Sequence, residues 1–387
     1  MPQVLQITDK PFPGGGIRRV VEQQRDLLEP RGWDCTLLRL VHRGALAGTD
    51  TQVAPVQVAR LLPNDAASIA AVRCAASRAD VVNLHLGFTA ISPDFVTAAA
   101  ASAPLVVSLH DVSPFEGMRL PEMGIDARDG NLPLRIRLTQ FRLRQIRREV
   151  WCRICSDARV FVAPSHFLAR LAQAAGAPVA RIRVVPHVSE DTGTAAPAPS
   201  TCPPVIAYAG LISDEKGTPL LVDTFARLKT TDARLVILGE GPALERLKRQ
   251  TAAKGLGDRI EFRGQVDAAE VARILAGARV LAHPSLVPEG FGLVGIEAMQ
   301  TGRPVAGFGL GGCGDWLIHD VTGLVAERQN SSSLATCLDR LLGDGVLADR
   351  LGAAAQRHVK REFSALRVAD ALVAALNSAR SIWRGSS

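Results

Sequence analysis

Short apolar runs alternate with longer amphipathic stretches along the first half of the chain. The apolar runs have the length and β-branched content of buried strands, and they cover residues 4–8, 34–40, 81–85, 105–110 and 160–164. The stretches between them repeat their apolar positions with helical spacing, at residues 17–28, 66–78, 92–101 and 167–175. Strands that alternate with helices predict a parallel, doubly wound α/β sheet.

The same alternation restarts after a proline-rich segment that is poor in apolar residues. Strand-like runs cover residues 205–210, 234–238, 259–262 and 279–283, and helical stretches cover 218–229, 243–253 and 268–276. We therefore expect a first domain at residues 1–188, a linker at 189–204, a second domain at 205–362, and a C-terminal segment at 363–387 that is mostly one helix crossing back to the first domain. Ligands of open α/β sheets bind outside the carboxyl ends of the strands, which is where candidate chemistry is sought.

Composition narrows the class of protein. The chain has 387 residues, enough for two or three domains with sizeable cores, and 47% of them are hydrophobic. We expect a cytoplasmic protein, because no apolar stretch is long enough to span a bilayer and the N-terminus leads directly into a strand. Seven scattered cysteines argue against a disulfide framework. Cys152 and Cys155 lie in a helical pattern without a second ligand pair nearby, so we expect ordinary thiols there.

A basic stretch between Asn131 and Arg153 concentrates positive charge in a chain whose net charge is +7. It contains one acid, Glu149, and seven arginines: Arg135, Arg137, Arg142, Arg144, Arg147, Arg148 and Arg153. Apolar residues recur within it at helical spacing, which predicts an amphipathic helix with a basic face. A solvated face is the simplest interpretation, and contact with an anionic membrane or a phosphorylated acceptor is the alternative. Nucleic acid is disfavoured, because no aromatic platform accompanies the arginines.

Candidate chemistry is densest at residues 284–305, where two carboxylates, Glu289 and Glu297, flank a glycine-rich turn that opens a helix. A helix N-terminus suits a phosphate group, and Gly290 and Gly292 let the backbone approach a ligand closely. Glu297 lies about one turn inside the helix, where its carboxylate can accept hydrogen bonds from a vicinal diol such as a ribose. A phosphate flanked by two hydroxyl-binding acids describes a nucleotide sugar.

This segment is similar to the signature of the retaining glycosyltransferases of sequence family four. The signature places two glutamates, with seven residues between them, within Pro-Ser-x(n)-Glu-Gly-Phe-Gly-Leu-x(3)-Glu-Ala-Met, which the chain matches closely at residues 284–299. The resemblance implies an α/β protein of the GT-B fold, with two Rossmann-like domains facing a central cleft. It also implies that Glu289 holds the transferred sugar as a catalytic residue. Donor contacts are implied for Gly290, Phe291, Gly292, Leu293 and Glu297.

Three further segments of the second half resemble elements of this family's donor site. Residues 208–217 resemble its Gly-Arg-Leu-x(n)-Lys-Gly element, so Gly210 and Lys216 are donor-binding candidates. Leu211 stands where the family has an arginine that binds the diphosphate, and a compensating cation at Arg18 or Arg19 is one hypothesis. Residues 262–266 match a segment that lies near the nucleotide base in relatives, which makes Arg263 a further candidate. Residues 311–316 resemble the family's Gly-Gly-x-x-Glu loop.

The first half resembles the family in two segments that contain candidate site residues. Gly15 and Gly16 belong to a glycine loop that opens the first helix and approaches the donor phosphate in relatives. His110 and Asp111 resemble a strand that ends in His-Asp, and the resemblance implies that the histidine reaches the transferred sugar as a catalytic residue. The segment 185–189 departs from the family's Pro-Asn-Gly-Val-Asp, which leaves the hinge geometry open.

These observations predict a retaining, metal-independent glycosyltransferase that needs no cofactor beyond its nucleoside-diphosphate-sugar donor. The acceptor would be a hydroxyl on a glycan-lipid or a small molecule, in cell-envelope glycan or natural-product biosynthesis, and the enzyme would be cytoplasmic or peripheral to the inner face of the membrane. Two alternatives remain open. One is a sugar-nucleotide epimerase or a phosphorylase on the same fold, and the other is a catalytically silent GT-B partner subunit.

Overall fold

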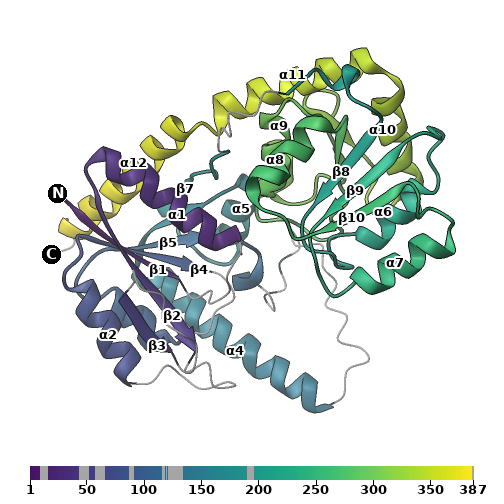
Figure 1. Ribbon diagram of the computed structural model, residues 1–387. Helices are drawn as coiled ribbons and strands as arrows, with labels where there is room; N and C mark the ends of the chain where they lie inside the picture. The colour runs from purple at the N-terminus through teal and green to yellow at the C-terminus, as the bar shows by residue number, and fades with distance from the viewer. Residues whose placement is uncertain are drawn as a thin grey trace. The chain divides into compact units, whose positions relative to one another are not determined.

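The computed structural model describes residues 1–8, 16–42, 52–56, 66–86, 91–115, 118, 120, 134–189 and 196–385. The chain divides into two compact units. The first comprises Met1–His187 together with Leu366–Ser387, and the second comprises Val188–Ala365. Each unit contains a parallel sheet with helices on both faces, so the predicted doubly wound α/β class is confirmed (Figure 1).

The first unit is built on a seven-stranded sheet of order β3-β2-β1-β4-β5-β6-β7. Its strands are β1 (Gln3–Thr8), β2 (Asp34–His42), β3 (Gln52–Val56), β4 (Val81–Leu86), β5 (Leu105–Leu109), β6 (Ala158–Ala163) and β7 (Ile182–Val184). Its helices are α1 (Gly16–Leu28), α2 (Ala66–Ala76), α3 (Pro93–Ala99), α4 (Leu134–Asp157), α5 (His166–Ala174) and α12 (Ala365–Arg384).

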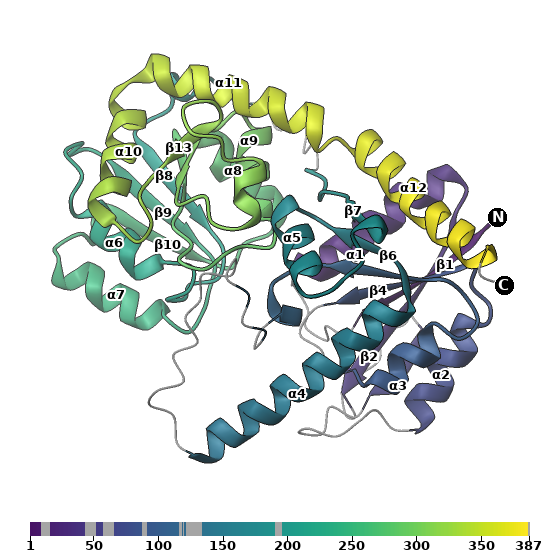
Figure 2. The same ribbon diagram turned by 180° about the vertical axis from the view of Figure 1, so that it is seen from behind.

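Alternate residues of these strands serve two different faces of the sheet. Leu5, Ile7 and Leu84 pack in one apolar core with Phe95 of α3 and Trp151 of α4. Figures 1 and 2 show α2, α3 and α4 on one side of the sheet, and α1 and α12 on the other. The intervening strand residues therefore face the side of α1, and several of them are polar.

The last helix, α12, packs within the first unit. Arg31 bonds the Asp370 carboxylate through Nε and Nη2, each at 3.0 Å. Arg380 lies over the ring of Trp33, 5.7 Å from its centroid, and its Nη2 is 3.4 Å from an oxygen of Asp80. These contacts join α12 to residues that directly precede β2 and β4.

The second unit is built on a six-stranded sheet of order β10-β9-β8-β11-β12-β13. Its strands are β8 (Val205–Ala209), β9 (Arg234–Leu238), β10 (Ile260–Gly264), β11 (Val280–His283), β12 (Val305–Gly307) and β13 (Gly323–Val325). Its helices are α6 (Thr218–Phe225), α7 (Leu244–Ala253), α8 (Ala268–Gly277), α9 (Leu293–Gln300), α10 (Ser331–Gly343) and α11 (Gly345–Glu362).

Sheet order in the second unit brings distant segments together. β8 and β11 are neighbours, and Ile206 pairs with Val280. Parallel strands end at the same edge of a sheet, so the loop after β8 and the loop after β11 emerge side by side. Those two loops contain the residues that the sequence marks for diphosphate and sugar.

The proline-rich segment before β8 is held by two arginines of the second unit. Arg303, with a side chain that is almost fully buried, donates hydrogen bonds to the carbonyls of Pro197 and Ala278. Arg279 reaches the carbonyls of Pro199 and Ser200 at 3.2 Å each. Three carbonyl groups of this segment, those of Pro197, Pro199 and Ser200, thus have guanidinium partners, as backbone groups removed from water require.

Candidate functional site

Glycines bring the loops of the second unit into contact at the carboxyl edge of its sheet. A Cβ atom at Gly217, whose φ is +70°, would lie 2.0 Å from the carbonyl oxygen of Pro284. A Cβ atom at Gly239 would lie equally close to the carbonyl oxygen of Gly210. Because these backbones approach so closely, the loop after β8 is fixed against the loops after β9 and β11.

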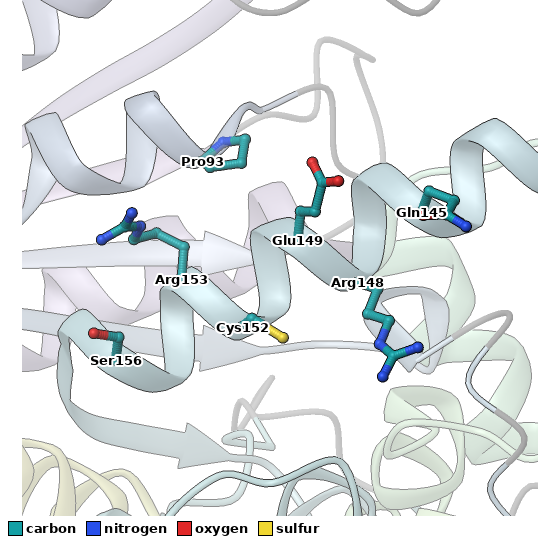
Figure 3. A pocket seen from close by; sticks show the side chains of 7 residues that line it. All are labelled: Pro93, Gln145, Arg148, Glu149, Cys152, Arg153 and Ser156. Atoms are coloured by element: carbon teal, nitrogen blue, oxygen red, sulfur yellow. The ribbon is translucent and has the colours of Figure 1, made fainter.

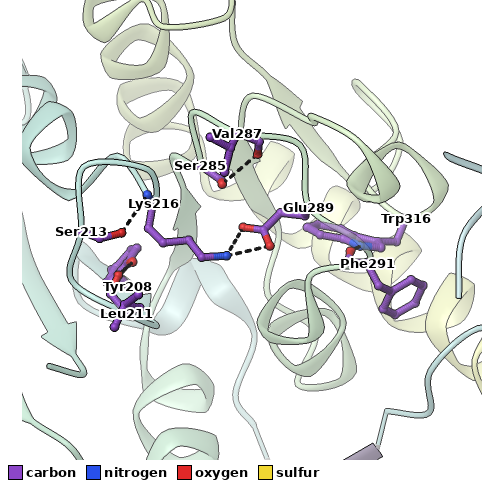
Figure 4. Close-up of polar contacts among 9 residues, drawn as sticks. All are labelled: Tyr208, Leu211, Ser213, Lys216, Ser285, Val287, Glu289, Phe291 and Trp316. Carbon is purple, nitrogen blue, oxygen red and sulfur yellow. Dashed lines mark hydrogen bonds and ion pairs between the residues drawn. The ribbon is translucent and has the colours of Figure 1, made fainter. Parts of the chain in front are cut away.

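An ion pair joins the loop after β8 to the loop after β11. Lys216 Nζ lies 2.6 Å from Glu289 Oε1 and 2.7 Å from Glu289 Oε2. In Figure 4 the lysine side chain extends from its loop to the carboxylate, and dashed lines reach both oxygens. The side chain of Lys216 is 34% exposed and that of Glu289 is 13% exposed, so solvent reaches the lysine more readily. The sequence marks both residues separately, and the structure brings them together.

The surroundings of Glu289 keep its carboxylate ionised. Burial opposes ionisation, but the charges of Lys216 and His283 and the hydrogen bonds from Lys216 and Ser285 outweigh it, so the pKa of Glu289 lies below its usual value. His283 is buried at the end of β11, and that burial lowers the pKa of its imidazole. At neutral pH the site therefore offers a negative carboxylate beside a positive ammonium group.

The backbone of Glu289 is fixed as firmly as its side chain. Its N–H donates to the carbonyl of Leu310 at 3.3 Å, and its carbonyl accepts from the N–H of Gly312 at 2.8 Å. Gly311 has φ of +69°, and a Cβ there would lie 2.5 Å from the carbonyl oxygen of Glu289. The loop that resembles the family's Gly-Gly-x-x-Glu element therefore holds Glu289 through its backbone.

Helix α9 begins shortly after this carboxylate. Gly292 is its N-cap residue with φ of +89°, a left-handed conformation that favours glycine, and Leu293 is its first residue. A Cβ at Gly292 would lie 3.1 Å from the Trp316 ring, and one at Gly295 would lie 2.2 Å from it. Trp316 in turn donates from Nε1 to the carbonyl of Phe291 at 2.6 Å. A buried tryptophan thus packs directly against the start of the helix.

The remaining donor-site candidates differ in their placement. Gly290 and Phe291 are buried in the loop between Glu289 and α9, and Glu297 is half-buried in the second turn of α9. Gly210 follows β8 and lies beside Gly239.

Arg263 is the candidate least connected to the ion pair. It lies on the edge strand β10, where its side chain is 44% exposed and pairs with Glu261 at 2.6 Å. Its guanidinium therefore belongs to an exposed contact within its own strand, and the structure does not join it to Lys216 or Glu289.

Leu211, at the position where the family has an arginine, is 51% exposed. Its backbone is held by Tyr208, whose hydroxyl donates to the Leu211 carbonyl at 2.8 Å. Figure 4 shows Leu211 beside Tyr208, which lies on β8. The side chain at this position thus reaches solvent, in the same loop after β8 that contains Lys216.

In the first unit, His110 follows β5 and is 8% exposed. Its Nε2 lies 2.9 Å from Nδ1 of His85, and its ring stacks on that of His187 with centroids 5.8 Å apart. The family pattern marks His110 but neither of the other two histidines. Gly16 is the first residue of α1, and Gly15 lies outside the described residues.

A signal for the missed histidine His85 exists in the sequence. Gln6, Asn83, His85 and Ser108 interrupt otherwise apolar strands, and Asn83 and His85 stand two residues apart, which places them on one face. Polar residues on one face of a buried strand must find partners. The alternation across three strands therefore indicates a polar cluster beside His110.

The basic helix that the sequence predicts is α4, which has 24 residues. Among its described side chains, Val150 and Ile154 are buried, and Arg142 and Arg148 are exposed. Contact of residues 131–153 with a membrane or a phosphorylated acceptor stays a prediction, and the side chains of Arg135 and Arg137 lie outside the described residues. Figure 3 shows a hollow beside α4, lined by Pro93, Gln145, Arg148, Glu149, Cys152, Arg153 and Ser156.

Two kinds of feature are absent from the described part of the chain. It has no cluster of three or more His, Cys, Asp or Glu side chains arranged to hold a metal ion. Within the same residues, no helix combines the length and the apolar character needed to cross a membrane.

Both halves of the chain match family models of glycosyltransferases. Residues 14–188 match the family model described as "Glycosyltransferase Family 4", and residues 194–358 match the model described as "Glycosyl transferases group 1". The chain is 34% identical over 188 residues to 2-deoxystreptamine glucosyltransferase from Streptomyces kanamyceticus, a match that covers 45% of this chain and 48% of that protein. It is also 34% identical over 167 residues to D-inositol 3-phosphate glycosyltransferase from Jonesia denitrificans, covering 41% and 39% of the two chains. The chain thus spans less than half of the length of either relative.

Solved structures resemble the whole chain. The structure of Anabaena HepE in complex with UDP and glucose superposes with a TM-score of 0.75 at 18% identity, covering 98% of this chain and 100% of that one. Sucrose-phosphate synthase from Thermosynechococcus elongatus gives a TM-score of 0.76 at 18% identity and covers 100% of both chains. At this identity the likeness shows the fold, which is the GT-B fold that the sequence predicts. Since two adjoining family models together account for both halves, the protein belongs to the family-four glycosyltransferases with the GT-B fold.

Proposed function

We propose that the protein is a retaining glycosyltransferase that moves a sugar from a nucleoside-diphosphate sugar to a hydroxyl acceptor. The observation that carries the proposal is the Lys216–Glu289 ion pair. It places a cation beside a carboxylate, in the loop that leads to the N-terminus of α9. A diphosphate needs positive charge, and a sugar ring needs hydrogen-bond acceptors. This part of the second unit supplies both.

In this proposal the second unit stabilises the departing nucleoside diphosphate. Lys216 and the N-terminus of α9, at Gly292 and Leu293, meet the negative charge that develops as the glycosidic bond breaks. Glu297 holds the ribose hydroxyls, and Glu289 holds hydroxyls of the transferred sugar. Because the lysine and the helix terminus supply the positive charge, we propose a reaction that needs no metal ion.

We propose that the sugar keeps its configuration at the anomeric carbon, because the chain resembles the retaining enzymes of family four. The acceptor hydroxyl attacks the face that the leaving diphosphate vacates, and a diphosphate oxygen takes the acceptor's proton. Neither Glu289 nor Glu297 forms a covalent bond to the sugar in this scheme. His110 keeps the role implied by the family pattern, a hydrogen bond to the transferred sugar.

The names of two relatives support a small molecule as the acceptor. The two curated relatives described above are named for 2-deoxystreptamine and for D-inositol 3-phosphate, both small molecules. The structure of HepE contains UDP and glucose, which supports a nucleotide sugar as the donor class. We therefore propose a small hydroxylated acceptor and natural-product biosynthesis ahead of a cell-envelope glycan-lipid.

A panel of nucleotide sugars tests this function on the full chain without knowledge of the acceptor. The expected result is that one nucleoside-diphosphate sugar raises the unfolding temperature and is slowly hydrolysed, with water replacing the acceptor. Proton NMR identifies the anomer that is released first, and we expect the configuration of the donor. Release of the opposite anomer contradicts retention, conversion to a different nucleotide-sugar epimer favours an epimerase, and absence of any binding favours a silent subunit.

A second prediction concerns Leu211. Replacing it with arginine should tighten nucleoside-diphosphate binding about tenfold, because an exposed side chain here gains a charge-assisted contact with phosphate. Isothermal titration calorimetry measures the change, and Leu211→Gln is the matched control, long and polar but uncharged. Equal affinities for the two variants would mean that the residue at 211 does not reach the diphosphate.

A further inference from the structure

A buried polar network lies in the first unit, and the proposed function uses a single member of it. Strand register brings its members together, because Gln6 pairs with Asn83 and His85 pairs with Ser108. Helix α1 contributes Gln24, so the network occupies the space between the sheet and that helix. Each member is at most 8% exposed, and together they are Gln6, Gln24, Asn83, His85, Ser108 and His110.

The hydrogen bonds of the network lead from Ser108 to Asn83 and from Asn83 to Gln6 and Gln24. Ser108 Oγ donates to Asn83 Oδ1 at 2.8 Å. On the other side of the amide, Asn83 Nδ2 donates to Gln6 Oε1 at 2.9 Å and to Gln24 Oε1 at 3.2 Å. These two contacts use both hydrogens of the amide, so its 3.3 Å approach to Nε2 of His85 does not make that nitrogen an acceptor.

These partners determine where His85 carries its proton. Burial, together with the neighbouring charge of His187, lowers the pKa of His85 to about 3, so its ring is neutral at pH 7 and has one N–H group. Nε2 lies 2.5 Å from the Gln6 oxygen, which is able only to accept, so Nε2 must be the protonated nitrogen. Nδ1 is then a hydrogen-bond acceptor, and the group that it faces, at 2.9 Å, is Nε2 of His110.

We propose that His85 is a positioning residue that fixes the proton of His110 on Nε2, so that Nδ1 of His110 is the nitrogen that accepts a hydrogen bond from a hydroxyl of the transferred sugar. The assignment of the tautomer rests on the network alone, and its use on the sugar rests on the function proposed above. It defines a substrate class, because an acceptor nitrogen receives a hydroxyl and repels a carboxylate. Sugars with a hydroxyl at this position are favoured over uronic acids.

The tautomer is measured directly in the unmodified protein. Full-length chain containing ¹⁵N-histidine is studied at pH 7.5 by multiple-bond ¹H–¹⁵N correlation, and the His110 signals are identified by their loss in His110→Gln. We expect Nε2 to show the chemical shift of a protonated nitrogen and Nδ1 that of an unprotonated one. The reverse pattern overturns the proposal, and it does so without any ligand or activity.

Two substitutions of His85, by side chains of similar size, distinguish a role in positioning His110 from a role in packing alone. His85→Asn retains an oxygen close to the place of Nδ1, so it should preserve the His110 tautomer. His85→Leu removes the acceptor, so His110 should become a mixture of tautomers. A His110 spectrum that is unchanged in the leucine variant overturns the positioning role, and thermal unfolding establishes that each variant is folded. If the leucine variant does not fold, the spectra of the unmodified protein and of His85→Asn still show whether the proton of His110 lies on Nε2.

Enzyme assays on the same variants connect the tautomer to the sugar. His85→Leu should lower the turnover of the hydrolysed donor about five- to tenfold, the effect of one lost hydrogen bond, while His85→Asn restores it. Binding of the nucleoside diphosphate alone, which has no transferred sugar, should be unchanged. Unchanged turnover in both variants contradicts the contact with the sugar. The expected tautomer in a protein that binds no nucleotide sugar would instead contradict the proposed function and leave the network assignment intact.

Discussion

Replacing Glu289 with glutamine should lower donor turnover about a hundredfold while leaving nucleoside-diphosphate binding as tight as before, or tighter. Turnover and diphosphate affinity should change differently because Glu289 has two separate interactions. Its carboxylate is proposed to hold the transferred sugar, and it also neutralises Lys216 through contacts of 2.6 and 2.7 Å. Glutamine keeps the shape of the side chain, loses its charge, and so frees the Lys216 charge for phosphate.

Two assays on one variant provide the test. Release of nucleoside diphosphate in the absence of acceptor gives the turnover, and isothermal titration calorimetry with the nucleoside diphosphate gives its affinity. Glu270→Gln is the matched control, because it removes a carboxylate from an exposed pair with Arg273 in the same unit. Equal turnover for Glu289→Gln and the unmodified chain would remove Glu289 from the mechanism. A large loss of diphosphate affinity would instead show that the carboxylate acts at the phosphate.

Replacing Gly217 with alanine should destabilise the protein by about 2–5 kcal/mol, far more than the same change at Gly255. Both glycines have left-handed backbones, with φ of +70° and +66°. A Cβ at Gly255 meets nothing within 4 Å, whereas a Cβ at Gly217 meets the Pro284 carbonyl oxygen at 2.0 Å. The change at Gly255 costs only the strained conformation, about 1–2 kcal/mol, and the change at Gly217 must also move backbone.

Urea unfolding of the two alanine variants, in the full chain and under one condition, isolates this difference. The excess loss at Gly217 measures how tightly the loop after β8 is held against the loop after β11. Because Gly217 is adjacent to Lys216, the same variant should also bind the nucleoside diphosphate more weakly. Equal destabilisation of the two variants would mean that the loops separate readily and that their contact does not position Lys216.

The structure of the segment from Glu289 to Glu297 was predictable because the residues that determine it are adjacent in sequence. Gly292, where a left-handed backbone is required, and the apolar residues that follow it mark the start of a helix within one short stretch. The structure begins α9 at Leu293, directly after the glycine-rich turn that predicts the start of a helix. Strands β8, β9 and β11 were predictable for a similar reason, since each is a compact and mostly apolar run.

The pairing of Lys216 with Glu289 was not predictable from spacing, because 73 positions of sequence separate them. It depends on β8 and β11 being neighbours, which sequence periodicity does not determine. The same limit applies to Trp316, which packs against Gly295 of α9 from a later loop of the chain. Long-range contacts of this kind need the order of the strands.

Short strands, and one strand that contains proline, escape prediction for another reason. β7, β12 and β13 have three residues each, too few for a periodic pattern. β3 contains Pro55 and lies at the edge of its sheet, where proline is tolerated. Helices α10 and α11 have no separate prediction within residues 205–362, although Asn330 and Asp344 cap them.

A crystal structure of the chain with a nucleoside diphosphate tests the central claim most directly. The account predicts a phosphate oxygen within hydrogen-bond distance of Lys216 Nζ, the diphosphate against the backbone N–H groups at Gly292 and Leu293, and the ribose hydroxyls on the carboxylate of Glu297. A diphosphate bound elsewhere on the second unit, with Lys216 still paired to Glu289 and Glu297 away from the ribose, would contradict it.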